Sequence, residues 1–196
     1  GSGGRKLSNW IAGFLEYMDN TEPPESYKIW VAVSVIAACL ERKCSLPWML
    51  DSIYPNLYIV LVGPAGRTRK GTAMGPGLSL LQETGVQLAA EATTREALIR
   101  RLKKASSNEV NVSQGRIEAM HSSLTVFSKE LTVFLGYGND QLMSDLCDWF
   151  DCGSTWTYET KTQGIENITG VWVNLIGATT PEILAQALPT TNAIGG

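Results

Sequence analysis

The sequence predicts an α/β fold, with a parallel central sheet flanked by helices and preceded by a small N-terminal helical segment. Three short apolar runs, at residues 57–62, 124–127 and 171–176, are typical of buried parallel strands. Stretches with helical periodicity and capping residues lie before and between these runs. With 196 residues, 44% of them hydrophobic, the chain is long enough to bury one good core.

The first helices are predicted ahead of the sheet. Trp10, Phe14 and Met18 recur at four-residue spacing after a Ser/Asn cap, and a second apolar face follows Pro24 as far as about residue 41. These helices must pack on the flank of the sheet or on a neighbouring subunit. Residues 45–55, with two prolines, predict an irregular approach to the first core strand.

We divide the chain into three parts. Residues 1–7 are expected to be a tag or a disordered lead, 8–50 a helical segment, and 51–196 the α/β core. The net charge of −3 excludes a surface that is basic throughout, so any nucleic acid would be held by a local patch or by a ring of subunits.

The chain shows no membrane span and no signal sequence, so a cytoplasmic protein without a membrane partner is expected. Its four cysteines form two C-x4-C pairs, Cys39/Cys44 and Cys147/Cys152. Zinc sites favour shorter spacings and nearby histidines, and the only histidine is His121. Reduced structural thiols are therefore favoured over a metal site.

The run at residues 57–62 leads into a segment that is typical of a phosphate-binding loop. Glycines let backbone N–H groups turn around a phosphate chain, and a following helix adds its positive dipole end. Lys70 would reach the β- and γ-phosphates, and the Thr72 hydroxyl would hold Mg²⁺. The candidate nucleotide-binding residues are Gly63, Pro64, Ala65, Gly66, Arg67, Thr68, Arg69, Lys70, Gly71 and Thr72.

This segment departs from the usual Gly-x4-Gly-Lys-Ser/Thr pattern. Lys70 lies one residue too far from Gly63, Arg69 takes the place of the second glycine, and Gly71 separates Lys70 from Thr72. The alternative is an ordinary Gly/Pro turn between a strand and a helix, carrying a solvated basic cluster. Gly75-Pro76-Gly77 should also delay or kink the helix predicted over 70–84.

Polar residues follow the other two apolar runs. In ATPases with this loop, a second strand ends in an Asp that holds the Mg²⁺ shell and a Glu that polarises the attacking water. Here Glu130 stands at the position of that Glu, Lys129 replaces the Asp, and Ser128 could help to hold the metal. Alternatively, Glu130 is a helix N-terminal acid beside the dipole.

The third run is followed by Thr179 and Thr180, either of which could sense the γ-phosphate or cap the helix predicted over 181–188. A Thr-capped helix ending in a basic turn is predicted over 93–104, and the basic turn is a candidate DNA contact. Residues 106–123 predict a loop or weak hairpin. A second hairpin is predicted around Lys161, another candidate DNA contact.

The order of these parts resembles the P-loop ATPase domains of primase-helicase-like replication proteins of phages, plasmids and other mobile elements, which are similar to AAA+ and superfamily 3 helicases. The most specific segments are residues 62–72 and 176–182. The resemblance implies ATP and Mg²⁺ binding by Lys70 and Thr72, catalysis by Glu130, sensing by Thr179, assembly into a homo-oligomeric ring, and translocation on single-stranded or forked DNA.

In those relatives, an arginine that reaches the neighbouring subunit's ATP follows a segment like Ile194-Gly195-Gly196, so a core truncated at its C-terminus is expected. Two other functions stay open. One is a non-hydrolysing nucleotide-binding or assembly module with a degenerate loop. The other is a small-molecule kinase, for which Arg95, Arg100 and Arg101 are the candidate lid residues.

Overall fold

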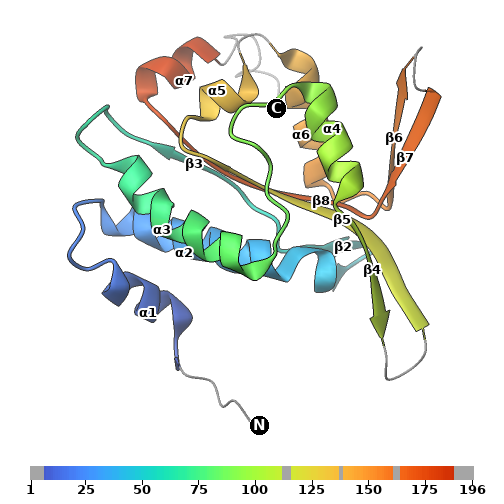
Figure 1. The fold of residues 1–196 in the computed structure, drawn as a ribbon, viewed down its shortest axis with the longest axis horizontal. Coiled ribbons are helices and arrows are strands. Elements are labelled where there is room, and N and C mark those ends of the chain that lie inside the picture. The colour runs from blue at the N-terminus through green and yellow to red at the C-terminus, as the bar shows by residue number, and fades with distance from the viewer. Residues whose placement is uncertain (1–6, 112–115, 137–138, 161–163, 188–196) are drawn as a thin grey trace.

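The structure is a computed structural model that describes residues 7–111, 116–136, 139–160 and 164–187. A four-stranded sheet with strand order β3-β8-β5-β4 forms the middle layer. Strands β3, β8 and β5 are parallel to one another, and β4 is antiparallel to β5. Helices α1 to α3 cover one face of this sheet and α4 to α7 the other (Figure 1). The predicted parallel sheet between helices, with helices ahead of it, is confirmed.

The helices and strands have the following bounds: α1 Trp10–Tyr17, α2 Glu25–Leu40, a 3-10 turn Glu41–Lys43, β1 Leu46–Trp48, β2 Asp51–Ile53, β3 Tyr58–Val62, α3 Lys70–Thr84, α4 Arg95–Lys104, β4 Ser106–Asn111, β5 Arg116–Ser128, α5 Leu131–Leu135, α6 Asp140–Phe150, β6 Thr155–Thr160, β7 Gly164–Thr169, β8 Val171–Thr179 and α7 Pro181–Ala187.

Strand β8 is the centre of the fold. All nine of its residues are buried, because β3 and β5 pair with its two edges while helices cover both of its faces. Val173 and Leu175 belong to the hydrophobic cluster on the α4 and α6 side. Ile176 and Ala178 belong to the cluster formed with α1, α2 and α3. The buried strand predicted at 171–176 is confirmed and extends to Thr179.

Strand β3 is parallel, as predicted, but the prediction that it is buried is wrong. Among the described residues it is an edge strand, and of its five residues only Leu61 is buried. Val60 and Val62 are exposed, with exposed fractions of 41% and 37%, and β8 pairs with only one side of this edge strand. An apolar run therefore predicted the strand correctly without predicting its place in the sheet.

The N-terminal helices form part of the core on one face of the sheet. Phe14 and Met18 of the first helical stretch join Val31 and Val35 of α2 in one cluster with residues of α3, β3 and β8. The predicted cap of α1 is confirmed, since the Asn9 side chain accepts a hydrogen bond from the Ala12 N–H at 3.1 Å. Lys28 of α2 is buried, and its Nζ donates to the Met18 carbonyl at 2.8 Å, which ties the two helices together.

The expectation of an irregular segment at 45–55 is wrong. Strands β1 and β2 form an antiparallel hairpin in which Trp48 pairs with Asp51, leaving Met49 and Leu50 in the turn. Met49 has a φ of +54°, a conformation that a two-residue hairpin turn demands and that usually selects Gly or Asn. Because neither residue is a typical turn former, the sequence did not reveal this hairpin.

Helix α3 runs without interruption through Gly75-Pro76-Gly77, so the predicted delay did not occur. A Cβ atom on Gly77 would lie 2.6 Å from Val31 Cγ1 and 3.2 Å from Val35 Cγ2. The glycine therefore lets α2 and α3 pack closely. This packing offsets the hydrogen bond that Pro76 cannot donate.

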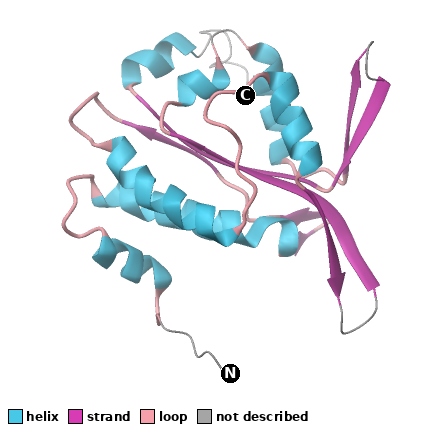
Figure 2. Ribbon diagram, viewed as in Figure 1, coloured by secondary structure: helices cyan, strands magenta, loops and turns pink. Residues whose placement is uncertain are grey.

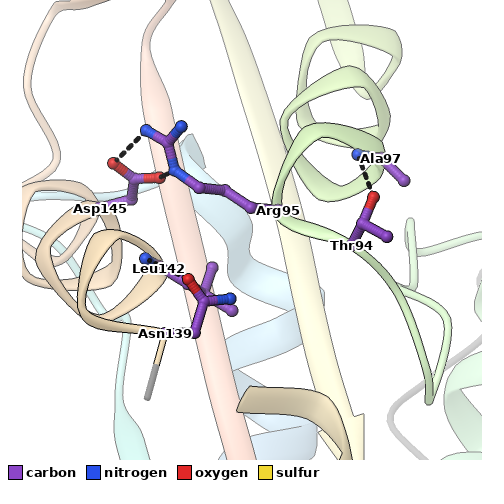
Figure 3. A network of polar contacts seen from close by, with 6 residues as sticks. All are labelled: Thr94, Arg95, Ala97, Asn139, Leu142 and Asp145. Atoms are coloured by element: carbon purple, nitrogen blue, oxygen red, sulfur yellow. Dashed lines mark hydrogen bonds and ion pairs between the residues drawn. The ribbon is translucent and has the colours of Figure 1, made fainter. Parts of the chain in front are cut away.

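Helices α4 and α6 are joined by a bidentate ion pair (Figure 3). Arg95 donates from Nε to Asp145 Oδ2 at 2.6 Å and from Nη2 to Asp145 Oδ1 at 3.0 Å. This hydrogen bonding raises the pKa of Arg95 above its usual value. The predicted cap of α4 is also confirmed, since Thr94 Oγ1 accepts from the Ala97 N–H at 3.2 Å.

Two hairpins extend away from the helices (Figure 2). Strands β4 and β5 form the first, which confirms the weak hairpin that was one of two alternatives for 106–123. Strands β6 and β7 form the second, as predicted. Lys161, the candidate DNA contact, lies outside the described residues. Between α3 and α4, Leu88 forms an isolated parallel bridge with Thr125 of β5.

All four cysteines are free thiols, and the described residues contain no group of His, Cys, Asp and Glu side chains that could hold a metal ion. Cys152 is buried, and burial raises its pKa to about 11. Cys39 is exposed, but partial burial of its thiol also raises its pKa. In the described part of the chain, no helix is both long and apolar enough to cross a membrane.

Alkylation should follow this order of burial and pKa. Because the thiolate is the nucleophile, iodoacetamide at mildly alkaline pH should label Cys44 and Cys147 first, Cys39 more slowly, and Cys152 only after unfolding. Peptide mass spectrometry at several times would give the four rates. Equal labelling of Cys152 and Cys147 in the folded chain would contradict the burial described here.

Candidate phosphate-binding site

The predicted phosphate loop lies at the carboxyl edge of the parallel sheet. Strand β3 ends at Val62 and α3 begins at Lys70, so residues 63–69 form the loop between them. The ends of the other two parallel strands lie beside it, because Val62 pairs with Thr179 and Ser128 pairs with Gly177. The Gly63 N–H donates to the Thr179 carbonyl at 3.2 Å. Ligands of open α/β sheets bind at this edge.

Lys70 folds back over the loop that precedes it. Its Nζ donates to the Gly63 carbonyl at 2.5 Å, to Thr68 Oγ1 at 3.3 Å and to the Pro64 carbonyl at 3.4 Å. The ammonium group is thus held inside the loop and is half-buried. An ammonium in this position supplies a positive charge to an anion that the loop encloses.

The start of α3 adds a second source of positive potential. Arg69 occupies the N-cap in the left-handed conformation, with a φ of +46°, and its side chain makes no capping hydrogen bond. The first backbone N–H groups of a helix have no partner within the helix. These donors and the helix dipole together favour an anion at this end.

A side chain on Gly63 would force Tyr27 or Thr68 to move. A Cβ atom there would lie 2.5 Å from the Tyr27 hydroxyl oxygen and 2.7 Å from Thr68 Oγ1. Tyr27 of α2 also donates from its hydroxyl to the Val62 carbonyl at 2.6 Å. Sequence reasoning missed Tyr27, since nothing in its helical pattern separates it from a packing residue.

The other predicted loop residues lie on the surface. Pro64, Ala65, Gly66 and Arg67 are exposed, and Gly66 has a φ of +72°. Arg69 is also exposed, and its Nε lies 2.7 Å from Glu22 Oε2. The loop is therefore open to solvent at its tip and closed at its base.

Thr72 and Lys70 are not brought to the same side of α3. They are two residues apart, which is about 200° of rotation around the helix. Gly71 and Thr72 are both exposed. The usual pattern would place the hydroxyl directly after the lysine, where Gly71 stands in this chain.

Two buried hydroxyl residues lie at the ends of the neighbouring strands. Thr179 is 3% exposed, and its Oγ1 is buried with no hydrogen-bond partner among the described residues. A buried hydroxyl without a partner is costly, so an anionic oxygen at this strand end would gain a hydrogen bond from it. Ser128, 1% exposed, faces the same side of the sheet, because side chains alternate along each strand. Thr180 caps α7 by accepting from the Ile183 N–H at 3.3 Å.

Glu130 is exposed and lies at the N-cap of α5, with no capping hydrogen bond from its side chain. The next residue, Leu131, packs on Gly177, since a Cβ on that glycine would lie 2.6 Å from Leu131 Cδ1. Gly177 is two residues before Thr179 on β8. The structure thus places Glu130 at the same edge of the sheet as the loop, with its side chain exposed.

The residues fit a polyphosphate better than they fit a protein-held metal. Lys70, the first turn of α3 and Thr179 Oγ1 are all suited to anionic oxygens. Ser128 and Thr72 offer hydroxyl oxygens of the kind that Mg²⁺ accepts, but one is buried and the other lies away from Lys70. A Mg²⁺ ion here would be held chiefly by phosphates and water.

No known protein family model matches this chain, and a comparison with curated proteins found no relative.

Proposed function

We propose that this chain binds ATP through the loop at residues 63–69 and forms the ATP-hydrolysing core of a helicase-like replication protein of a mobile element. The observation that carries the proposal is the position of Lys70. Its ammonium is held on the loop carbonyls between a parallel strand and a helix N-terminus, at the edge of the sheet where β8 also ends.

Binding would exchange one set of contacts for another. The γ- and β-phosphates would accept from the first N–H groups of α3 and from Lys70, which would turn from the Gly63 carbonyl toward the anion. The Thr179 hydroxyl would gain a partner in a γ-phosphate oxygen. Each of these donors would form a stronger hydrogen bond with a phosphate oxygen than any that it forms in the chain without nucleotide.

Hydrolysis would rely on positioning and on electrostatic stabilisation. A water oxygen would bond to the γ-phosphorus in line with the leaving oxygen, and the bond between that phosphorus and the β–γ bridging oxygen would break. Glu130 would orient this water and accept its proton, and the products would be ADP and phosphate. Lys70 would offset the charge that develops on the phosphate oxygens.

Replacing Glu130 by glutamine should separate binding from turnover. The amide keeps the size of the side chain but cannot accept a proton, so ATP hydrolysis should fall about 100-fold while ATP affinity stays within about twofold. Phosphate release and fluorescent-ATP titration would measure the two quantities. Glu16→Gln, an exposed change on α1, is the matched control. Full ATP turnover in the Glu130→Gln variant would contradict the assignment of Glu130 as the general base.

The alternative is a non-hydrolysing nucleotide-binding or assembly module. Two observations favour it: Lys129 stands where a metal-holding aspartate would be, and Thr72 faces away from Lys70. A wild-type chain that binds ATP but releases no phosphate, alone or with DNA, would establish this alternative.

DNA translocation is a separate part of the proposal, with its own support. It is supported by the resemblance of the loop and of the segment at 176–182, and by two hairpins that extend away from the helices. Phosphate release should therefore increase when single-stranded DNA is added to an assembled protein. Hydrolysis that is unaffected by single-stranded and forked DNA would remove the helicase part and leave the ATPase.

A further inference from the structure

A cavity of about 540 Å³ lies along the open edge of β3, next to the phosphate loop. Its walls are Ser26, Tyr27 and Trp30 of α2 and residues 57–62. The volume is within the range of about 300–1,000 Å³ that is usual for small-molecule pockets. The cavity and the loop share a boundary at Tyr27. Its hydroxyl donates to the Val62 carbonyl, and the hydroxyl oxygen would lie 2.5 Å from a Cβ atom added to Gly63.

The backbone of β3 presents hydrogen-bonding groups to this cavity. The Leu57 carbonyl accepts from the Leu175 N–H at 2.8 Å, and the Gly63 N–H donates to Thr179 at 3.2 Å, so the odd-numbered residues bond to β8. In a parallel strand, the alternate residues point their N–H and C=O groups the other way. Val62 follows this rule, since its carbonyl accepts from Tyr27.

Val60 is the alternate residue in the middle of the cavity wall. Its N–H and C=O both point to the open edge, and the residue is 41% exposed. It precedes Gly63 by three residues, which is about 10 Å along the strand. A ribose and its first phosphate bridge a distance of this order. Val60 thus offers an N–H donor beside a C=O acceptor. Both lie as far from the loop as the base of a nucleotide whose phosphates occupy the loop.

Trp30 supplies an aromatic surface to the same cavity. It is 48% exposed, although indole rings are usually well buried in folded chains. It lies three residues after Tyr27, so both side chains emerge from the same side of α2. Every nucleobase has a π-face that stacks on such a ring, with a contribution of about 1–3 kcal/mol per base.

We propose that this cavity is the base subsite of the nucleotide whose phosphates occupy the loop, and that it selects adenine. The inference rests on the proposed function. Trp30 stacks on the base, the Val60 carbonyl accepts from the adenine amino group, and the Val60 N–H donates to a ring nitrogen. Guanine presents acceptors in place of that amino donor, so its oxygen would face the Val60 carbonyl.

Three probes separate the base subsite from the phosphate site: ATP, GTP and inorganic tripolyphosphate, the last of which has no base. Wild-type protein should bind ATP about tenfold more tightly than GTP or tripolyphosphate. Trp30→Ala should weaken ATP binding about tenfold and leave tripolyphosphate binding unchanged. Trp30→Phe should recover part of the loss. Isothermal titration calorimetry gives all the affinities.

Trp48→Ala is the matched control, since Trp48 is an exposed tryptophan on the β1–β2 hairpin, outside this cavity. Equal affinities for ATP and tripolyphosphate in the wild type, or a Trp30→Ala protein with unchanged ATP affinity, would overturn the base subsite alone. ATP and GTP of equal affinity would overturn its selectivity for adenine. A wild-type chain that binds none of the three probes would overturn the phosphate site and the base subsite together.

Discussion

Replacing Lys70 by alanine should weaken ATP binding at least about 100-fold. The variant removes the cation that the loop carbonyls hold in place, and with it the charge-assisted hydrogen bonds to the phosphates. Such bonds contribute about 1.5–3 kcal/mol each, and about 2.7 kcal/mol corresponds to 100-fold in affinity. Titration with a fluorescent ATP analogue and Mg²⁺ would measure the change.

Lys104→Ala is the matched control for this experiment. Lys104 is an exposed lysine in the last turn of α4, so its removal changes the net charge equally without touching the loop. Lys70→Arg adds a second variant, which keeps the charge but not the compact ammonium group. If Lys70→Ala folds with an unchanged circular dichroism spectrum and binds ATP like Lys104→Ala, the loop is not a phosphate site.

Replacing Asp145 by alanine should lower the free energy of unfolding by about 3 kcal/mol. Asp145 is buried and Arg95 is mostly buried, with side-chain exposures of 8% and 18%. The variant would leave the Arg95 guanidinium without its bidentate partner between α4 and α6 (Figure 3). Urea denaturation followed by tryptophan fluorescence would give the stability.

Asp148→Ala on the same helix is the control, because Asp148 is exposed and its loss should change stability by less than about 0.5 kcal/mol. The double variant Arg95→Met/Asp145→Leu should recover most of the loss, since apolar side chains of similar volume leave no buried charge unpaired. A double variant as unstable as Asp145→Ala would show that packing, and not the unpaired charge, causes the loss.

Local signals in the sequence determined most of the secondary structure. The apolar run at 171–176 predicted β8, and the Asn9 and Thr94 side chains predicted the starts of α1 and α4. These predictions succeed because the strand's apolar run and a cap's hydrogen bond involve residues close together in the chain. The loop at 63–69 was proposed as a phosphate site for the same reason, since Gly63, Gly66 and Lys70 lie within one short stretch of the chain.

Only the tertiary structure decided how these elements are used. Val60 and Val62 belong to an apolar run like that of β8, yet they are exposed because β3 is an edge strand among the described residues. The order of strands in a sheet depends on contacts between segments that are distant in the chain. Helix α3 continues through Gly77, and there it packs closely against α2. The contact between Tyr27 and Val62, which joins residues 35 positions apart, left no local trace in the sequence.

The same distinction between sequence and tertiary structure applies to the candidate site. Lys70, Glu130 and Thr179 could be chosen from the sequence because each follows or precedes an apolar strand at a recognisable position. That Thr72 faces away from Lys70, and that the Thr179 hydroxyl is buried without a partner, depended on the phase of a helix and on the packing around a strand end. Both are properties of the folded chain, since they arise only when the strands and helices meet.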